Sequence, residues 1–406
     1  MRLLTHRSLN PSRFAALTPS STIAANDRLQ ALRAAGKDVL SFNVGEPDFP
    51  SPPPAVEAAR KSLAQGYTKY APSMGLPALR SALCEHLRDN NGLELNPDQV
   101  LVTPAKFGVF ATILALIGEG DEVLLSDPSW VSYVPIIQLA GGTPVFVKTR
   151  TSGFVLDPAD VEAAISPRTR LLILNSPHNP TGAMVSLRHL EQLADIAQRK
   201  DLWVLSDEIY ERIAYDSVHH SIAALGGMAE RTLTVSGFSK SYAMTGWRIG
   251  WLTGPAKMVA RLGALHQHAL TCLPAFVQAG ALAVLQDPAA AQYQKDMVAT
   301  LRQRRDLLVS GLQRIEGFAC KAPAGAFYVF PETSFVLRGT ALADHLLEAA
   351  NVAVAPGISF GPTREDHIRL SYACSSGVIA DGLDRIAEAM VGADLQPRPA
   401  EATATS

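Results

Sequence analysis

Short apolar runs alternate with longer helical patterns through the middle of the chain. Several of the runs, such as LLILN and LWVL, are almost continuously hydrophobic, which is typical of strands buried on both faces of a parallel sheet. Between two of them, LRHLEQLADIAQRK (residues 187–200) spaces its Leu, Ile and Ala residues as an amphipathic helix does. The runs predict seven strands, at residues 99–104, 121–128, 143–149, 169–177, 201–208, 231–238 and 248–254. This alternation predicts an α/β fold with a mainly parallel, doubly wound sheet flanked by helices.

The pattern changes after about residue 285. A long charged helix is predicted at residues 294–315, and short strands in FAC, GAFYVF and VAVAPG follow it before a closing helix at residues 379–390. These elements predict a smaller α+β domain built from both chain ends. The predicted parts are an N-terminal segment (1–45) that packs with the small domain, a large domain (46–290), a small C-terminal domain (291–392) and a tail (393–406). The tail and residues 1–10 are polar or rich in Pro, Ala and Thr, which predicts disorder.

Composition narrows the class of protein. The chain has 406 residues, of which 47% are hydrophobic and 18% charged, with a net charge of −2, which suits a globular protein and not a nucleic-acid binder. Its four cysteines lie far apart without a CxxC pair, so we expect reduced thiols. No apolar run reaches the roughly 20 residues that span a bilayer, and MRLLTHRSLN lacks the apolar core of a signal peptide. We therefore expect a cytoplasmic protein with no nucleic-acid or membrane partner.

Three polar stretches follow predicted strands: SPHNPTG, SDEIY and SGFSK. Ligands of open α/β sheets bind outside the carboxyl ends of the strands, so Asn179, Asp207 and Lys240 are expected to meet there. Taken singly, each has an ordinary structural explanation, as a turn former, a helix cap and a surface charge respectively. Only their meeting at one sheet edge would indicate a site.

Around these residues the chain resembles the class I aminotransferases, fold-type-I enzymes that use pyridoxal 5'-phosphate (PLP), in the branch that includes bacterial aspartate aminotransferases. The resemblance runs from about residue 19 to residue 390. The matching stretches, in the family's order, are FNVGEPDF, YTKYAPSMGLPALR, DEVLLSDPSWVSY, LNSPHNPTG, LSDEIYERIAY, SKSYAMTGWRIG, GAFYVF and HIRLSYA. The fold that this resemblance implies is the PLP-binding large domain with its smaller partner domain.

The resemblance implies a role for each residue of the ring site. Lys240 would be the amine that bonds to the cofactor and then moves the substrate's proton as general base and acid. Asp207 would keep the pyridine nitrogen protonated, while Asn179 and Tyr210 would hydrogen-bond the phenolate oxygen. Trp130 matches the aromatic residue that stacks on the ring. Catalysis would therefore depend on Lys240, Asp207 and Tyr210.

The phosphate site is implied less directly, because two positions depart from the family pattern. In VTPAKFGVF, Pro104 and Ala105 stand where relatives have glycines, and Pro104 cannot donate a backbone N–H. Gly237 stands where many relatives have a serine, which Ser236 or Ser239 would replace. The implied phosphate ligands are Ala105, Lys106, Ser239, Arg248 and, from a neighbouring subunit, Tyr70. The last of these implies a homodimer with shared active sites.

Substrate recognition follows from the same resemblance. Arg369 would clamp the α-carboxylate in bidentate fashion, beside the backbone of Gly45, with Trp130 and Asn179 lining the site. Lys106 matches a lysine that meets a distal carboxylate, which favours aspartate or glutamate as amino donor, with a 2-oxo acid as acceptor in a ping-pong reaction. Phe107 replaces a polar residue of relatives, so an aromatic or aliphatic donor stays open. A PLP-dependent carbon–sulfur lyase on the same scaffold also stays open.

Two other motifs in the sequence do not indicate a functional site. GISFG (residues 357–361) matches a serine-hydrolase nucleophile pattern, but Asp366 and His367 follow too closely for a triad. The His pairs at 219–220 and 266–268 lack acidic or Cys companions at ligand spacing along the sequence, so no metal site is expected.

Overall fold

The computed structural model describes residues 21–149 and 152–391. The disorder predicted for residues 1–10 and 393–406 falls outside that range. Of the described helices, none has the length and hydropathy needed to cross a lipid bilayer. All four cysteines are unpaired thiols, as predicted.

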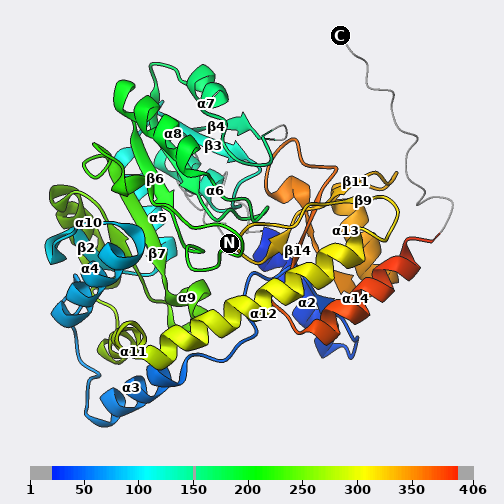
Figure 1. Cartoon of the computed structure of the whole chain (residues 1–406), viewed down its shortest axis with the longest axis horizontal. Coiled ribbons are helices and arrows are strands. Elements are labelled where there is room, and N and C mark those ends of the chain that lie inside the picture. The colour runs from blue at the N-terminus through cyan, green and yellow to red at the C-terminus, as the bar shows by residue number, and fades with distance from the viewer. Residues whose placement is uncertain (1–20, 150–151, 392–406) are drawn as a thin grey trace, which may run out of the picture.

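A seven-stranded sheet forms the centre of the molecule (Figure 1). The strands, in their order across the sheet, are β2 (Val100–Val102), β8 (Gly250–Thr253), β7 (Thr232–Gly237), β6 (Trp203–Asp207), β5 (Thr169–Asn175), β3 (Glu122–Asp127) and β4 (Thr143–Lys148). Neighbours from β7 to β4 pair in parallel, and β8 alone runs antiparallel to both of its neighbours. The predicted α/β fold with a mainly parallel sheet is confirmed, and each predicted run contains one of these strands.

Alternate side chains of the strands enter two different hydrophobic layers. In β3, Val123 and Leu125 pack with α5 (Ala105–Leu116) and α6 (Tyr133–Ala140). Leu124 points to the opposite face and packs with α8 (Leu187–Arg199). Both faces are therefore buried, which explains why the strands are almost continuously apolar in the sequence. The other helices of this part are α3 (Pro53–Ala64), α4 (Pro77–Asn91), α7 (Pro158–Ala164), α9 (Phe238–Ser241), α10 (Ala256–Leu270) and α11 (Ala275–Gln286).

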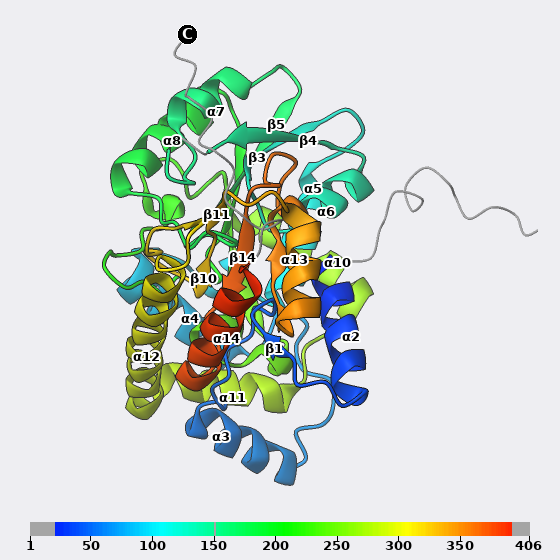
Figure 2. The same cartoon turned by 90° about the vertical axis from the view of Figure 1, so that its right-hand side faces the viewer.

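The remaining elements form a second group beside the sheet (Figure 2). Its strands are β9 (Phe318–Ala319), β10 (Tyr328–Val329), β11 (Glu332–Thr333), β12 (Val352–Ala353), β13 (Ala355–Pro356) and β14 (Ile368–Ser371), and its helices are α12 (Pro288–Leu312), α13 (Gly339–Ala349) and α14 (Ser376–Ala389). The N-terminal helix α2 (Ser21–Ala34) joins them, and β1 (Leu40–Ser41) pairs in parallel with β12. Both chain ends thus contribute to this group, as the α+β prediction requires.

The long helix α12 begins earlier than its charge pattern predicted. It starts at Pro288, with the Asp287 side chain accepting a hydrogen bond from the N–H of Ala289, so a capping residue and a proline at the first turn mark the start. The proposed division between residues 290 and 291 falls inside this continuous helix. The domain limits themselves remain a prediction.

Candidate active site

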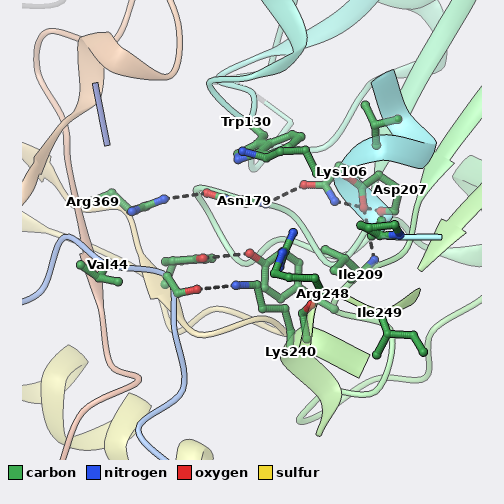
Figure 3. A pocket seen from close by; sticks show the side chains of 18 of the residues that line it. Val44, Lys106, Trp130, Asn179, Asp207, Ile209, Lys240, Arg248, Ile249 and Arg369 are labelled. Carbon is green, nitrogen blue, oxygen red and sulfur yellow. Dashed lines mark hydrogen bonds between the residues drawn. The ribbon is translucent and has the colours of Figure 1, made fainter. Parts of the chain in front are cut away.

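A cavity of about 370 Å³ lies at the carboxyl ends of β5, β6 and β7, against the second group of elements (Figure 3). It brings together the predicted residues Gly45, Ala105, Lys106, Trp130, Asn179, Asp207, Tyr210, Ser239, Lys240, Arg248 and Arg369. Tyr70 is the exception, because its side chain is 87% exposed and does not line the cavity of this single chain. Residues that are scattered over most of the sequence therefore converge on one space.

Lys240 lies on the short helix α9, directly after β7. Its ammonium donates a hydrogen bond to the backbone carbonyl of Gly45, with an Nζ–O distance of 2.5 Å. Burial lowers the pKa of Lys240 to about 8, against the opposing effect of Glu46 and with help from the Arg248 and Arg369 cations. A useful fraction of this amine is therefore neutral near pH 8. Gly45 has no room for a side chain, since a Cβ there would lie 2.1 Å from the Tyr328 hydroxyl.

Asp207, the last residue of β6, is buried at the floor of the cavity. Its Oδ2 accepts a hydrogen bond of 2.7 Å from the hydroxyl of Tyr133, and its Oδ1 accepts one from the backbone N–H of Ile209 at 3.3 Å. Burial raises the pKa of Asp207 to about 6, although both hydrogen bonds act to lower it. Tyr133 was not among the predicted site residues, since nothing in DPSWVSY tells which of its aromatic residues will turn toward Asp207.

Arg369 approaches from β14, on the side opposite Asp207 (Figure 3). Its guanidinium donates to Asn179 Oδ1 at 3.0 Å and to the carbonyl of Asn43 at 2.6 Å. The rings of Tyr328 and Phe360 lie 4.4 and 4.7 Å from its Cζ atom, so the guanidinium is held between two aromatic faces. Its Nε is buried without a hydrogen-bond partner, which leaves a donor for an anionic ligand.

Tyr210 connects the two sides of the cavity. Its hydroxyl lies 2.8 Å from that of Tyr328, and both rings are buried. Burial raises the pKa of both phenols, so each remains a neutral hydrogen-bonding group at physiological pH. Tyr328 lies in the recognised GAFYVF stretch, but it had no predicted role.

The anion-binding end of the cavity is formed by the first turn of α5 together with Arg248 and Ser239. Pro104 occupies the capping position of α5, outside the first turn, so its missing N–H leaves the free donors of Ala105 and Lys106 in place. Of the two serines considered as replacements at Gly237, Ser239 lines the cavity. Ser236 instead donates to Glu208 and Glu211, away from the cavity, so the alternative of Ser236 was wrong.

Lys106 and Trp130 lie at the boundary between this cavity and a second, mostly apolar one of about 810 Å³. The Lys106 Nζ atom lies 5.0 Å from the centre of the Trp130 ring. Burial, followed by the charge of Arg248, lowers the pKa of Lys106. Phe107 lines the apolar cavity and not the first one, so it borders the site without facing Lys240.

His219 does have acidic neighbours, contrary to the sequence argument. Its Nε2 lies 2.9 Å from Glu208 Oε2, and Glu211 completes a compact group with them. The carboxylates are already satisfied, because Ser206, Ser221, Ser236 and Asn91 donate hydrogen bonds to them. This group is therefore a buried hydrogen-bond network behind Asp207. The spacing of these residues along the sequence did not predict the group, because His219 returns to Glu208 and Glu211 only in the folded chain.

Comparison with known proteins identifies the family. The model of aminotransferase class I and II matches residues 37–386. An aspartate/prephenate aminotransferase of Thermus thermophilus is 41% identical over 381 residues, covering 93% of this chain and 98% of the relative. An aspartate aminotransferase of Pinus pinaster is 42% identical over 401 residues, covering 95% of this chain and 81% of the relative. The chain belongs to the class I and II aminotransferases.

Solved structures agree with this aminotransferase fold. Aspartate aminotransferase from Thermus thermophilus with maleate superposes with a TM-score of 0.89 at 41% identity, covering 96% of this chain and all of that one. An aromatic aminotransferase from Pyrococcus horikoshii gives 0.85 at 37% identity, covering 90% and 98%. The predicted PLP fold type I is thereby confirmed, and the cofactor of this aminotransferase is PLP.

The residues of the cavity fit that cofactor chemically. The first turn of α5 and Arg248 offer donors for a phosphate dianion at one end. Asp207 is the one carboxylate lining the cavity among the described residues, and it can accept a hydrogen bond from a protonated ring nitrogen. Lys240 supplies the amine between them, with a pKa low enough to react with an aldehyde.

Proposed function

We propose that this aminotransferase exchanges amino groups between an acidic L-amino acid, aspartate or glutamate, and a 2-oxo acid by ping-pong half-reactions. The observation that carries the proposal is the burial of Lys240 in the same cavity as Asp207, Arg248 and Arg369. PLP bound there supplies an electron sink for the pair released when the substrate Cα–H bond breaks.

Each residue has a separate role in this proposal. Lys240 takes the proton from the substrate Cα atom and delivers it to the cofactor's C4′ atom, which its pKa of about 8 permits near neutral pH. Asp207 holds the ring nitrogen in its protonated form. Asn179 and Tyr210 donate hydrogen bonds to the ring oxygen, and Trp130 covers the ring face. The α5 N-terminus, Ser239 and Arg248 hold the phosphate.

Substrate choice depends on the two ends of the cavity. Arg369 binds the α-carboxylate that every amino acid and 2-oxo acid shares. The Lys106 ammonium lies 5.0 Å from the centre of the Trp130 ring and supports a distal carboxylate as the second anchor. The apolar cavity beyond Phe107 favours the alternative, an aromatic or aliphatic side chain. The exposed Tyr70 supports a homodimer in which each subunit donates this tyrosine to its partner's phosphate site, and we place the enzyme in the cytoplasm.

The experiment is a visible absorption titration of the purified protein loaded with PLP. Adding aspartate alone is expected to bleach the yellow band, and adding a 2-oxo acid is expected to restore it. Bleaching by aromatic or aliphatic donors only would replace the acidic substrate by the alternative. Release of pyruvate and ammonia from a sulfur amino acid would instead indicate a carbon–sulfur lyase. Failure of the protein to form the band with added PLP would refute the proposed site.

A further inference from the structure

The carboxyl end of β3 is joined to the loop before β14 by a buried group of polar contacts. Asp127 and Arg364 are both only 1% exposed, and the Arg364 Nε lies 3.2 Å from Asp127 Oδ1. A second guanidinium nitrogen of Arg364 donates to the Asp127 backbone carbonyl. The Thr363 hydroxyl donates to the other carboxylate oxygen at 2.5 Å. The carboxylate thus holds the loop at both of its oxygens.

Two further features show how closely the segments approach. The backbone N–H of Ser129 donates to the carbonyl of Phe360 at 2.7 Å. At Gly361, a Cβ atom would lie 1.9 Å from Asp127 Oδ1, so a side chain cannot be accommodated. The loop therefore lies directly on the strand end, with no layer of side chains between them.

This contact lies between two residues of the active site. Trp130 follows Asp127 by three positions, and Arg369 follows Arg364 by five. Phe360, whose carbonyl takes the Ser129 bond, places its ring 4.7 Å from the Arg369 guanidinium. The Asp127 contacts therefore connect the segment that carries Trp130 with the segment that carries Arg369.

Other polar links also join the two groups of elements. Residues 210–216 contact residues 323–328 through the Tyr210–Tyr328 hydroxyl pair and the backbone bonds of Tyr215 to Ala324 and of Ala326 to Ile213. Gly325 donates to the carbonyl of Gly182, and Arg369 itself donates to Asn179. The Asp127 contact differs from these links because it joins the end of β3, three residues before Trp130, to the loop that leads into β14.

A buried ion pair often adds little net stability, because both charges lose their hydration. Its geometry is nevertheless specific, since a guanidinium fork fits a carboxylate and a carbonyl in one orientation. We propose that Asp127, Thr363 and Arg364 form a positioning clamp that fixes Arg369 at the carboxylate-binding distance before substrate arrives. This rests on the proposed function, in which Arg369 binds the α-carboxylate.

The test compares Arg364→Gln and the near-isosteric Thr363→Val with wild type in the PLP-loaded enzyme. Active sites are counted by the visible absorption band. The control is Arg168→Gln, which removes one donor to Glu122, a buried carboxylate at the opposite end of the same strand β3; Arg168 itself is exposed, and Ser166 still donates to Glu122. KM and kcat are measured for both the amino acid and the 2-oxo acid, along with the thermal unfolding midpoint.

We expect Arg364→Gln to raise both KM values by about tenfold, equivalent to one weakened charge-assisted hydrogen bond, with kcat per active site changed less than about threefold. Thr363→Val should raise both in the same direction by a smaller factor, and the control should leave both unchanged. Unchanged KM values with a lowered unfolding midpoint would mean that the contact is only structural and would overturn the proposal. A fall in kcat alone would overturn it as well.

If Arg364→Gln fails to fold, Thr363→Val decides by the same criteria, because it removes one hydroxyl and no charge. The two proposals fail in different ways. A wild-type protein without turnover removes the proposed function and the clamp with it. Wild-type turnover with unaltered KM values in the variants removes the clamp alone.

Discussion

Replacing Tyr133 by Phe tests whether this tyrosine keeps Asp207 ionised. The change removes the hydroxyl that donates a 2.7 Å hydrogen bond to Asp207 Oδ2 and leaves the buried ring in place. A hydrogen bond to a charged acceptor contributes about 1.5–3 kcal/mol and one to a neutral acceptor about 0.5–1.5 kcal/mol. Their difference, about 1–1.5 kcal/mol, corresponds to a rise of about 1 in the pKa of Asp207. From about 6 in the wild type, this pKa would move to about 7 in the variant.

The assay uses the cofactor-free protein, in which Asp207 has no ring nitrogen beside it. Infrared titration follows the carbonyl stretch of the protonated carboxyl group, which is assigned by its loss in Asp207→Asn. Urea unfolding gives an independent reading. The pKa of Asp207 is raised above its ordinary value of 3.8, so this group makes the protein less stable as pH rises from about 4 to its native pKa. In Tyr133→Phe this loss continues to about pH 7, so the stability difference from wild type should widen by about 1–1.5 kcal/mol between pH 5 and pH 8.

The matched control is Tyr215→Phe. This tyrosine is partly buried and its hydroxyl donates to the backbone carbonyl of Ala326, which does not titrate. Its stability loss should therefore be constant over the same pH range. A stability difference for Tyr133→Phe that is equally constant, with an unmoved infrared titration, would refute the idea that Tyr133 controls the ionisation of Asp207.

Three further predictions concern the other charged groups. The rate at which cofactor-free protein binds PLP can be followed by stopped-flow absorbance. Because only the neutral amine reacts, this rate should rise about tenfold per pH unit below the Lys240 pKa of about 8 and become constant above it. A rate that does not change with pH would contradict the lowered pKa. Asp207→Asn should keep a native circular dichroism spectrum and lose about 10²- to 10³-fold in kcat, and near-normal turnover would show that its charge is dispensable. Lys106→Met should raise KM for aspartate by about 10- to 100-fold while kcat/KM for phenylalanine stays within about threefold; equal losses for both would place Lys106 at the phosphate instead.

The sheet and most of the site were predictable because their signals are local. A strand buried on both faces is apolar at most positions, so the centres of β5 and β6 can be recognised in the sequence as the runs LLIL and WVL. Ligand-binding residues of open α/β sheets lie at the carboxyl ends of the strands. On this basis Asn179, Asp207 and Lys240 were predicted to meet, and all three line one cavity.

The residues that sequence reasoning missed act through contacts between distant segments. Tyr133 reaches Asp207 from α6, and Tyr328 reaches Tyr210 from β10. The acidic neighbours of His219 are likewise set by a turn of the chain, and no ligand spacing predicts them. The start of α12 was predicted too late for another reason. The prediction used the charged residues from 294 onward, although Asp287 and Pro288 form the stronger start signal.

The pairing of β1 with β12 has a consequence for how the protein is made. Leu40 and Ser41 find their partners, Val352 and Ala353, only after nearly the whole chain has left the ribosome. The backbone of Gly45, which accepts the Lys240 hydrogen bond, lies just beyond β1, so it cannot be held in its final place until then. The central sheet can form earlier from segments that are closer in sequence, since loop closure is slower for distant contacts. A nascent or truncated chain that ends before β12 would thus present the reactive lysine in an open, unfinished cleft.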